Sequence, residues 1–171
     1  PMTSRSTLPR RALSVALLAL ALAPALLTSC KATTRKYPQT RLVQANNESD
    51  LWSSLISALR KERFKMSPSG ANETERTIET GWFTSLAPYK GAGYRLRAHA
   101  SYRKMPADQV GGLPEEQLPL GELRDDLESF LVTVRVEKER NDSMRGLQPE
   151  YAKWAPEDDD PNSAKRVLLH L

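Results

Sequence analysis

A stripe of hydrophobic residues at helical spacing follows a cluster of polar residues near position 50. Its members recur every three or four positions and would share one face of an α-helix: Leu51, Trp52, Leu55, Ile56 and Leu59. Asn47 precedes the stripe, and acidic residues follow it directly, which is typical of a helix start. The pattern predicts an amphipathic helix that begins after Asn47 and ends near Arg63.

Three later stretches alternate between hydrophobic and polar residues, as strands with one buried face do. The first spans about residues 75–83 and places Ile78, Thr80 and Trp82 on one face. The second has one hydrophobic face, formed by Tyr94, Leu96, Ala98, Ala100 and Tyr102. Its other face is polar and carries Arg95, Arg97, His99, Ser101 and Arg103. The third presents Phe130, Val132, Val134 and Val136.

Shorter signals complete the expected order of elements. Residues 42–43 and 64–66 resemble short strands, and the sequence Ser67-Pro68-Ser69-Gly70 should break the second of them. Residues 104–128, rich in proline and glycine, indicate a loop or insertion. Asp160 followed by Pro161 predicts the cap and first turn of a terminal helix.

This order predicts an α+β fold, with a small antiparallel sheet of three to four strands packed on one or two helices. The helical stripe needs an apolar partner, and the alternating strands offer one. We therefore expect it to lie on the face formed by Ile78, Trp82, Tyr94, Leu96, Ala98, Val132 and Val134. The expected domain covers residues 41–140, and residues 141–171 form a C-terminal extension that carries the terminal helix.

The N-terminal thirty residues have a different pattern. Residues 12–27 are free of charge and rich in Ala and Leu, and Arg5, Arg10 and Arg11 precede them. The run is shorter than the roughly 20 residues that a transmembrane helix needs. Basic residues followed by a short apolar run are typical of an export signal.

The run ends in Leu27-Thr28-Ser29-Cys30, which resembles the lipobox of bacterial lipoproteins. The resemblance implies that residues 1–29 are a signal peptide, cut between Ser29 and Cys30. It further implies that Cys30 carries a diacylglyceryl group and often an additional acyl chain such as palmitate. The alternatives are an ordinary signal peptide or an uncleaved anchor. Two or more acyl chains anchor a protein stably, whereas one binds reversibly.

Residues 30–40 are polar after the cysteine and predict a flexible tether between the bilayer and the domain. Lys31, rather than Asp, follows Cys30, which in the lipoprotein family implies the outer membrane, on its periplasmic side. Of 25 basic and 21 acidic residues, three basic residues and no acidic one lie before Cys30, so the rest is nearly neutral. Near-neutrality argues against a nucleic-acid partner. With one cysteine, neither an internal disulfide nor a zinc site built on cysteine pairs can form.

A second resemblance covers roughly residues 42–103. The stretch from Asp50 to Leu59, then Phe64, then Thr80-Gly81-Trp82, is similar to the helix and strand of BamC/NlpB-like outer-membrane lipoproteins. It implies a helix-grip-like domain and an accessory role in an outer-membrane assembly complex. The long N-terminal segment with which that family binds its partner has no counterpart here.

The candidate contact residues are Arg95 and Arg97 on the polar strand face, with Phe83 and Tyr89 as aromatic contacts. The stripe of Arg95, Arg97 and Arg103 could bind phosphates or lipid headgroups. It could equally pair across the sheet with Glu75, Glu79, Glu137 and Glu139, and near-neutral charge favours pairing. His99 could act as a base only with a carboxylate beside it, and a solvated strand face is favoured. Trp82 is expected in the core.

The acidic run of residues 157–160 lacks the spacing of a calcium loop, and a solvated run that ends in a helix cap explains it better. We expect no cofactor, no metal and no catalytic residue. The expected function is a non-catalytic binding or scaffold module, bound to the bilayer through Cys30 and to an envelope protein partner. The alternatives are a carrier of a lipid or hydrophobic ligand in a groove under the helix, and a hydrolase. A filled core under Trp52 and Trp82 would exclude the carrier.

Overall fold

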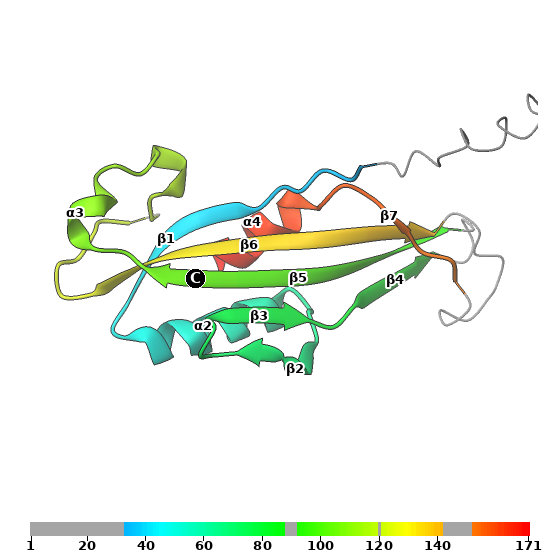
Figure 1. Ribbon diagram of the computed structural model, residues 1–171, viewed down its shortest axis with the longest axis horizontal. Helices are drawn as coiled ribbons and strands as arrows, with labels where there is room; N and C mark the ends of the chain where they lie inside the picture. The colour runs from blue at the N-terminus through cyan, green and yellow to red at the C-terminus, as the bar shows by residue number, and fades with distance from the viewer. Residues whose placement is uncertain (1–32, 88–91, 120, 142–151) are drawn as a thin grey trace, which may run out of the picture. The chain divides into compact units, whose positions relative to one another are not determined.

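The computed structural model describes residues 33–87, 92–119, 121–141 and 152–171 (Figure 1). Thr34–Leu171 form one compact unit. Its strands are β1 (Gln39–Ala45), β2 (Met66–Asn72), β3 (Thr77–Thr80), β4 (Phe83–Ala87), β5 (Ala92–Lys104), β6 (Glu128–Asn141) and β7 (Ala155–Pro156). Its helices are α2 (Glu48–Lys61), α3 (Ala107–Val110), the short 3-10 helix η3 (Glu115–Gln117) and α4 (Pro161–Leu169). No helix of the described residues is long and apolar enough to cross a membrane.

The strands form one antiparallel sheet of seven, in the order β1-β6-β5-β3-β2, with β4 beside β5 and β7 beside β6. The expected fold class, a small sheet of three to four strands on one or two helices, is therefore wrong. The two longest strands, β5 and β6, pair from Gly93–Asn141 to Lys104–Phe130 and form the centre of the sheet (Figure 1). The predicted break at residues 67–70 instead lies within the edge strand β2, where a register shift accommodates it.

Helix α2 begins and ends on local backbone signals. The side chain of Asn47 accepts a hydrogen bond from the Asp50 amide at 2.9 Å, as the sequence predicts for an N-cap. At the other end the Arg63 and Phe64 amides donate to the carbonyls of Arg60 and Leu59, which is a Schellman motif. Arg63 has a φ of 65°, the left-handed conformation that this motif requires.

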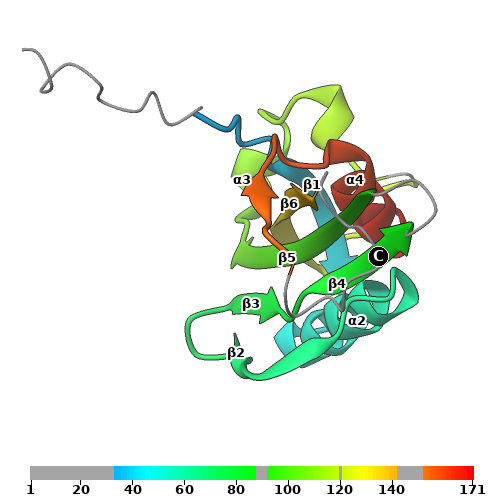
Figure 2. The same ribbon diagram turned by 90° about the vertical axis from the view of Figure 1, so that its right-hand side faces the viewer.

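Helices α2 and α4 cover the same face of the sheet and bury the main core (Figure 2). The core joins the stripe of α2 to alternate residues of β5 and β6 and to the inner face of α4: Leu51, Leu55, Leu59, Leu96, Ala98, Val132, Val134 and Val167. Trp52 is half-buried at its border, with its ring centroid 6.2 Å from that of Tyr102. Tyr94 is 40% exposed, and Trp82 lies on the opposite face against Arg95, so both expected core positions are wrong. The terminal helix belongs to the same compact unit.

The insertion between β5 and β6 folds over one end of the opposite face. Leu42, Met105 and Val110 form a second buried cluster there, with Leu113 and Leu131 packed against it. The Gln44 side chain exchanges two hydrogen bonds with the Arg124 backbone, of 2.9 and 3.0 Å, and so fixes the end of the insertion to β1. The rest of that face stays open.

The acidic residues before α4 make hydrogen bonds to other parts of the chain, so this run is not simply solvated. The Arg35 and Tyr37 amides donate to the carboxylates of Asp158 and Asp159 at 2.8 and 3.0 Å, and the Asp159 amide donates back to the Arg35 carbonyl. Residues 35–37, which the sequence analysis assigns to a free tether, are thus bound to the domain. The predicted cap Asp160 is confirmed by its hydrogen bonds to the Asn162 and Ser163 amides.

Gly70 lies where β2 crosses β3 most closely, and its substitution tests that crossing. A Cβ atom at this position would stand 2.0 Å from the Glu79 carbonyl oxygen, a backbone atom that cannot rotate away. We expect Gly70→Ala to lower the free energy of unfolding by about 1–3 kcal/mol. Gly111→Ala is the matched control, because nothing lies within 4 Å of its added Cβ, and it should change stability by no more than about 0.5 kcal/mol. Equal effects in urea denaturation would contradict the close approach.

Tyr102 should make the domain sensitive to alkali. Burial and a 3.0 Å hydrogen bond to the Glu48 carboxylate raise the pKa of Tyr102 to about 12. A raised phenol pKa means that its contribution to stability is complete below pH 10 and is lost as the pH rises towards 12. Tyr102→Phe should therefore flatten the alkaline decline in unfolding free energy, by no more than about 2–3 kcal/mol. Identical pH profiles for the variant and the wild type, measured by urea denaturation from pH 8 to 12, would contradict this assignment.

Candidate functional site

The face of the sheet opposite the helices gathers most of the polar side chains of β3, β5 and β6. Because side chains alternate across a strand, burying Ala98 and Ala100 places Arg97, His99 and Ser101 on this other face. The register then aligns polar residues in rows across the strands. Glu79, His99 and Arg135 form one row, and Thr77, Ser101 and Thr133 form the next.

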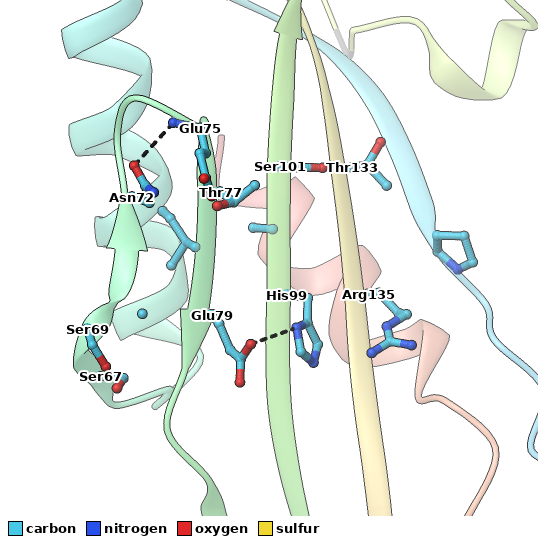
Figure 3. Close-up of a pocket in the computed structure, with 14 residues that line it drawn as sticks. Ser67, Ser69, Asn72, Glu75, Thr77, Glu79, His99, Ser101, Thr133 and Arg135 are labelled. Carbon is cyan, nitrogen blue, oxygen red and sulfur yellow. Dashed lines mark hydrogen bonds and ion pairs between the residues drawn. The ribbon is translucent and has the colours of Figure 1, made fainter.

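A shallow groove of about 660 Å³ crosses these rows (Figure 3). Hydroxyl and amide groups line it, from Ser67, Ser69, Asn72, Thr77, Ser101 and Thr133. Charged and ionisable groups line it as well, from Glu75, Glu79, His99 and Arg135. In Figure 3 the side chains of Glu79 and His99 point toward one another across the groove. The lining therefore offers many hydrogen-bond donors and acceptors on an open surface.

Three residues that line the groove, Glu79, His99 and Arg135, belong to a network of ionic contacts with Arg97 and Glu137 beside it. Arg97 bridges two carboxylates, at 2.6 Å from Glu79 and 2.8 Å from Glu137. His99 lies between the same two acids, with Nε2 3.2 Å from Glu137 and Nδ1 3.6 Å from Glu79. Arg135 stands 3.8 Å from Glu137 and 3.9 Å from Asp159. Glu137 is thus the shared acceptor of three cationic or ionisable groups.

Its surroundings favour the charged form of Glu137. Burial by itself opposes ionisation, but hydrogen bonds from Arg97 and His99, and their positive charge, outweigh burial and lower the pKa of this carboxyl. The charge of Glu137 therefore contributes to the stability of the folded state at neutral pH. This contribution is lost as the pH falls through the lowered pKa.

Two tryptophans and an arginine form a stack beside the groove. The guanidinium of Arg95 lies 4.3 Å from the ring centroid of Trp82 and 5.0 Å from that of Trp154, and it also donates to Glu139 at 2.6 Å. Arg97 lies 4.7 Å from the Trp82 ring. Such cation–π contacts give the arginines an orientation that a carboxylate alone would not fix. Trp154 lies in the segment before β7, so the stack also fastens that segment to the sheet.

The candidate contact residues of the sequence analysis have different positions. Arg95 and Arg97 lie at this site and pair with acids across the strands, whereas the exposed Arg103 has no ion-pair partner among the described residues. Phe83 packs against the main core. Cys30, Ser29 and Tyr89 lie outside the described residues.

The positions of Trp82 and Phe83 are the reverse of those expected, and the reason is local. The sequence analysis treats residues 75–83 as one strand. In the structure β3 ends at Thr80 and β4 begins at Phe83. This two-residue interruption changes the alternation, so that Phe83 joins Ile78 on the core side while Trp82 turns to the polar side. Gly81 is the one sequence signal that could have indicated the break.

The two histidines of the chain both contact carboxylates. His99 contacts carboxylates on both sides, but among the described residues it has no hydrogen bond to a hydroxyl that could act as a nucleophile. His170, the other histidine, pairs with Glu62 at the end of α4. No group of three or more His, Cys, Asp or Glu side chains in the described ranges has the arrangement of a metal site. The hydroxyl, amide and charged groups of this lining can donate to and accept from a polar partner.

Comparison of the sequence with known protein families and with curated proteins finds no match to either.

Glu137→Gln tests whether this carboxylate organises the charged face. The substitution keeps the size of the side chain but leaves Arg97, His99 and Arg135 without their shared negative partner. We expect it to lower the unfolding free energy by about 1–3 kcal/mol at pH 7. The difference from the wild type should shrink as the pH falls from about 4.5 through the lowered pKa, because the wild-type carboxyl then becomes protonated as well.

The control for this variant is Glu128→Gln, which removes an exposed ion pair with Lys104 from the same strand. Exposed pairs contribute about 0–1 kcal/mol, so this control should have little effect at any pH. Urea denaturation between pH 3 and 7 measures both variants. A Glu137→Gln effect that is constant over this range, or no larger than that of the control, would show that the network does not depend on the charge of Glu137.

Proposed function

We propose that this chain is a bacterial lipoprotein of the cell envelope whose domain is a non-catalytic binding or scaffold module. The proposal of an anchor is supported by residues 1–30, where a basic start and a short apolar run lead directly into Leu27-Thr28-Ser29-Cys30. Lys31 after the cysteine favours the outer membrane, facing the periplasm. Acyl chains on Cys30 would hold the protein at the bilayer without a membrane-spanning helix.

The contacts of residues 35–37 limit how far such an anchor would reach. Arg35 and Tyr37 are hydrogen-bonded to the acidic run before α4. Arg35 lies five residues after Cys30, and a chain of that length spans at most about 18 Å. The proposed lipoprotein would therefore keep its domain close to the headgroups, and would meet partners at the membrane surface rather than deep in the periplasm.

One observation carries the proposal of binding without catalysis. Arg97 and His99 each contact both Glu79 and Glu137, so these four side chains at the groove pair with one another. A general acid or base would need a reacting group within hydrogen-bond reach, and the groove is open rather than closed around one. Hydroxyl and amide groups beside the network can still donate to and accept from a partner.

The packing beneath α2 gives no support to the alternative of a lipid carrier. Leu51, Leu55 and Leu59 are fully buried against the sheet, and Trp52 packs on Tyr102 at the border. The space in which a hydrophobic ligand would lie under this helix is therefore occupied by side chains. An accessory role in an outer-membrane assembly complex is a further proposal, which rests on the likeness of residues 50–82 to BamC/NlpB-like lipoproteins.

The anchor is tested by Cys30→Ser in cells that make bacterial lipoproteins. We expect the wild-type chain in the membrane fraction, with a mass that shows the loss of residues 1–29 and the gain of acyl groups. The Cys30→Ser variant should keep residues 1–29 and gain no acyl mass. Ser29→Ala is the matched control, because a small residue before the cysteine suffices for the lipobox, and it should behave as the wild type. Unacylated wild-type protein, or an unchanged mass for Cys30→Ser, would exclude lipidation at this residue.

A further inference from the structure

Strand β1 has one free edge. It pairs with β6 from Gln39–Val134 to Ala45–Glu128, and no other strand of the described residues pairs with it. Between the described residues, none of the backbone hydrogen bonds outside the sheet and helices involves a residue of β1 either. Outward-facing N–H and C=O groups on a regular strand of seven residues form a template for one more strand.

Two hollows follow this free edge. The larger, of about 640 Å³, is lined by Gln39–Arg41 on β1, by Glu116 and Gln117 of η3, and by Lys165, Leu168 and Leu169 of α4. The smaller, of about 260 Å³, continues along residues 41–44 of β1 and is lined by Leu168, Leu169 and Leu171 on the same side. Consecutive residues of β1 and none of β6 line both hollows, so they lie on the outer side of the strand. The edge is therefore the floor of a groove between α4 and the η3 segment.

The α4 wall of this groove is apolar. Leu168 is buried, but Leu169 is 55% exposed, and Leu171 is only partly covered. Every second side chain of a strand added at this edge would point toward the α4 wall, because side chains alternate along a strand. Apolar side chains at these positions would cover the exposed leucine. The wall thus favours a partner with aliphatic residues at alternating positions.

The groove carries a positive charge that the described residues do not neutralise. Arg41 and Lys165 line it and have no ion pair or hydrogen bond among the described residues. By contrast, Arg166, the next residue of α4 after Lys165, pairs with Glu62. Glu116 is the acid that lines the same hollow. The two cations and one anion give this hollow a net positive charge, which a carboxylate on the partner would balance.

We infer that the free edge of β1 binds an extended, acidic peptide segment of a partner protein by strand addition, in the groove between α4 and η3. The backbone of β1 supplies the hydrogen bonds, the leucines of α4 select alternate aliphatic side chains, and Arg41 with Lys165 selects an acidic group. The inference rests on the proposed function only in that the domain is a binding module. It does not depend on the lipid anchor or on the polar groove.

A second copy of this chain fits the edge less well. Antiparallel pairing of β1 with its own copy about the middle of the strand would place the two Arg41 residues at diagonal positions, with cation near cation. The walls of α4 and η3 rise beside the edge on both copies and would have to fit past one another. A single peptide strand meets neither obstacle.

The experiment uses random short peptides displayed on phage, selected against the full chain purified in detergent. We expect enrichment of peptides with alternating aliphatic residues and at least one Asp or Glu. Synthetic copies of the enriched peptides are then titrated against variants. Leu169→Glu and Lys165→Glu should each weaken binding by about tenfold or more. Changing the acid of the peptide to Lys should restore binding to Lys165→Glu.

The matched controls replace exposed residues that do not line the groove. Leu123→Glu, at a leucine that is 47% exposed, and Lys153→Glu should bind within about twofold of the wild type. Hydrogen exchange gives a second measurement, since an added strand should protect amides of β1 that exchange quickly without peptide. Binding that resists Leu169→Glu and Lys165→Glu, or no enrichment at all, would overturn the inference. Protection of the outward-facing amides of β1, those not bonded to β6, before peptide is added would assign the edge to this chain or a second copy, and would also overturn it.

Discussion

The long antiparallel pairing of β5 with β6 is the interaction on which the rest of the domain depends. It extends from Gly93–Asn141 to Lys104–Phe130 and keeps one alternation of side chains throughout. The buried apolar residues that it directs to one side, among them Ala98, Val132 and Val134, form the main core with α2 and α4, and the residues between them are directed to the other side. A slip of one residue would expose Val132 and Val134 and bury Arg97 and Glu137, so the hydrophobic effect fixes the register of both faces together.

The charged network follows from that register rather than from any local motif. Arg97 meets Glu137 because the two are cross-strand partners, and Glu79 joins them because it is the cross-strand partner of His99, two residues further along β5. The network therefore requires three strands that are distant in sequence. It orders the open face without closing it, and this is why we attribute binding rather than catalysis to the domain. The groove at β1 also depends on the strand order, because β1 is the last strand on its side of the sheet and pairs only with β6 among the described residues.

Strongly periodic segments could be predicted from the sequence, and interrupted ones could not. The α2 stripe, the Asn47 and Asp160 caps and the alternation of β5 and β6 depend on nearby residues, and all are present as predicted. The sheet was underestimated because β2 contains Pro68 and Gly70 and because β3 and β4 are separated by two residues. The same interruption exchanged the faces of Trp82 and Phe83. Pairing of Arg95 and Arg97 with acids was one of two interpretations, and only the register could decide between them. Contacts between residues far apart in the sequence, such as that of Arg35 with Asp158, leave no periodic signal.

The division of the sheet into a buried and an open face is tested most directly by thiol labelling at two neighbouring residues of β5. The chain has one cysteine, so Cys30→Ser provides a background free of thiols. In that background Ala100→Cys and Ser101→Cys each introduce a single thiol. Ala100 is 4% exposed, whereas Ser101 is half-buried and lines the polar groove. The account predicts that Ser101→Cys reacts with a soluble thiol reagent in the native protein, whereas Ala100→Cys reacts only after unfolding in urea. Rapid native labelling of Ala100→Cys together with protection of Ser101→Cys would contradict the account.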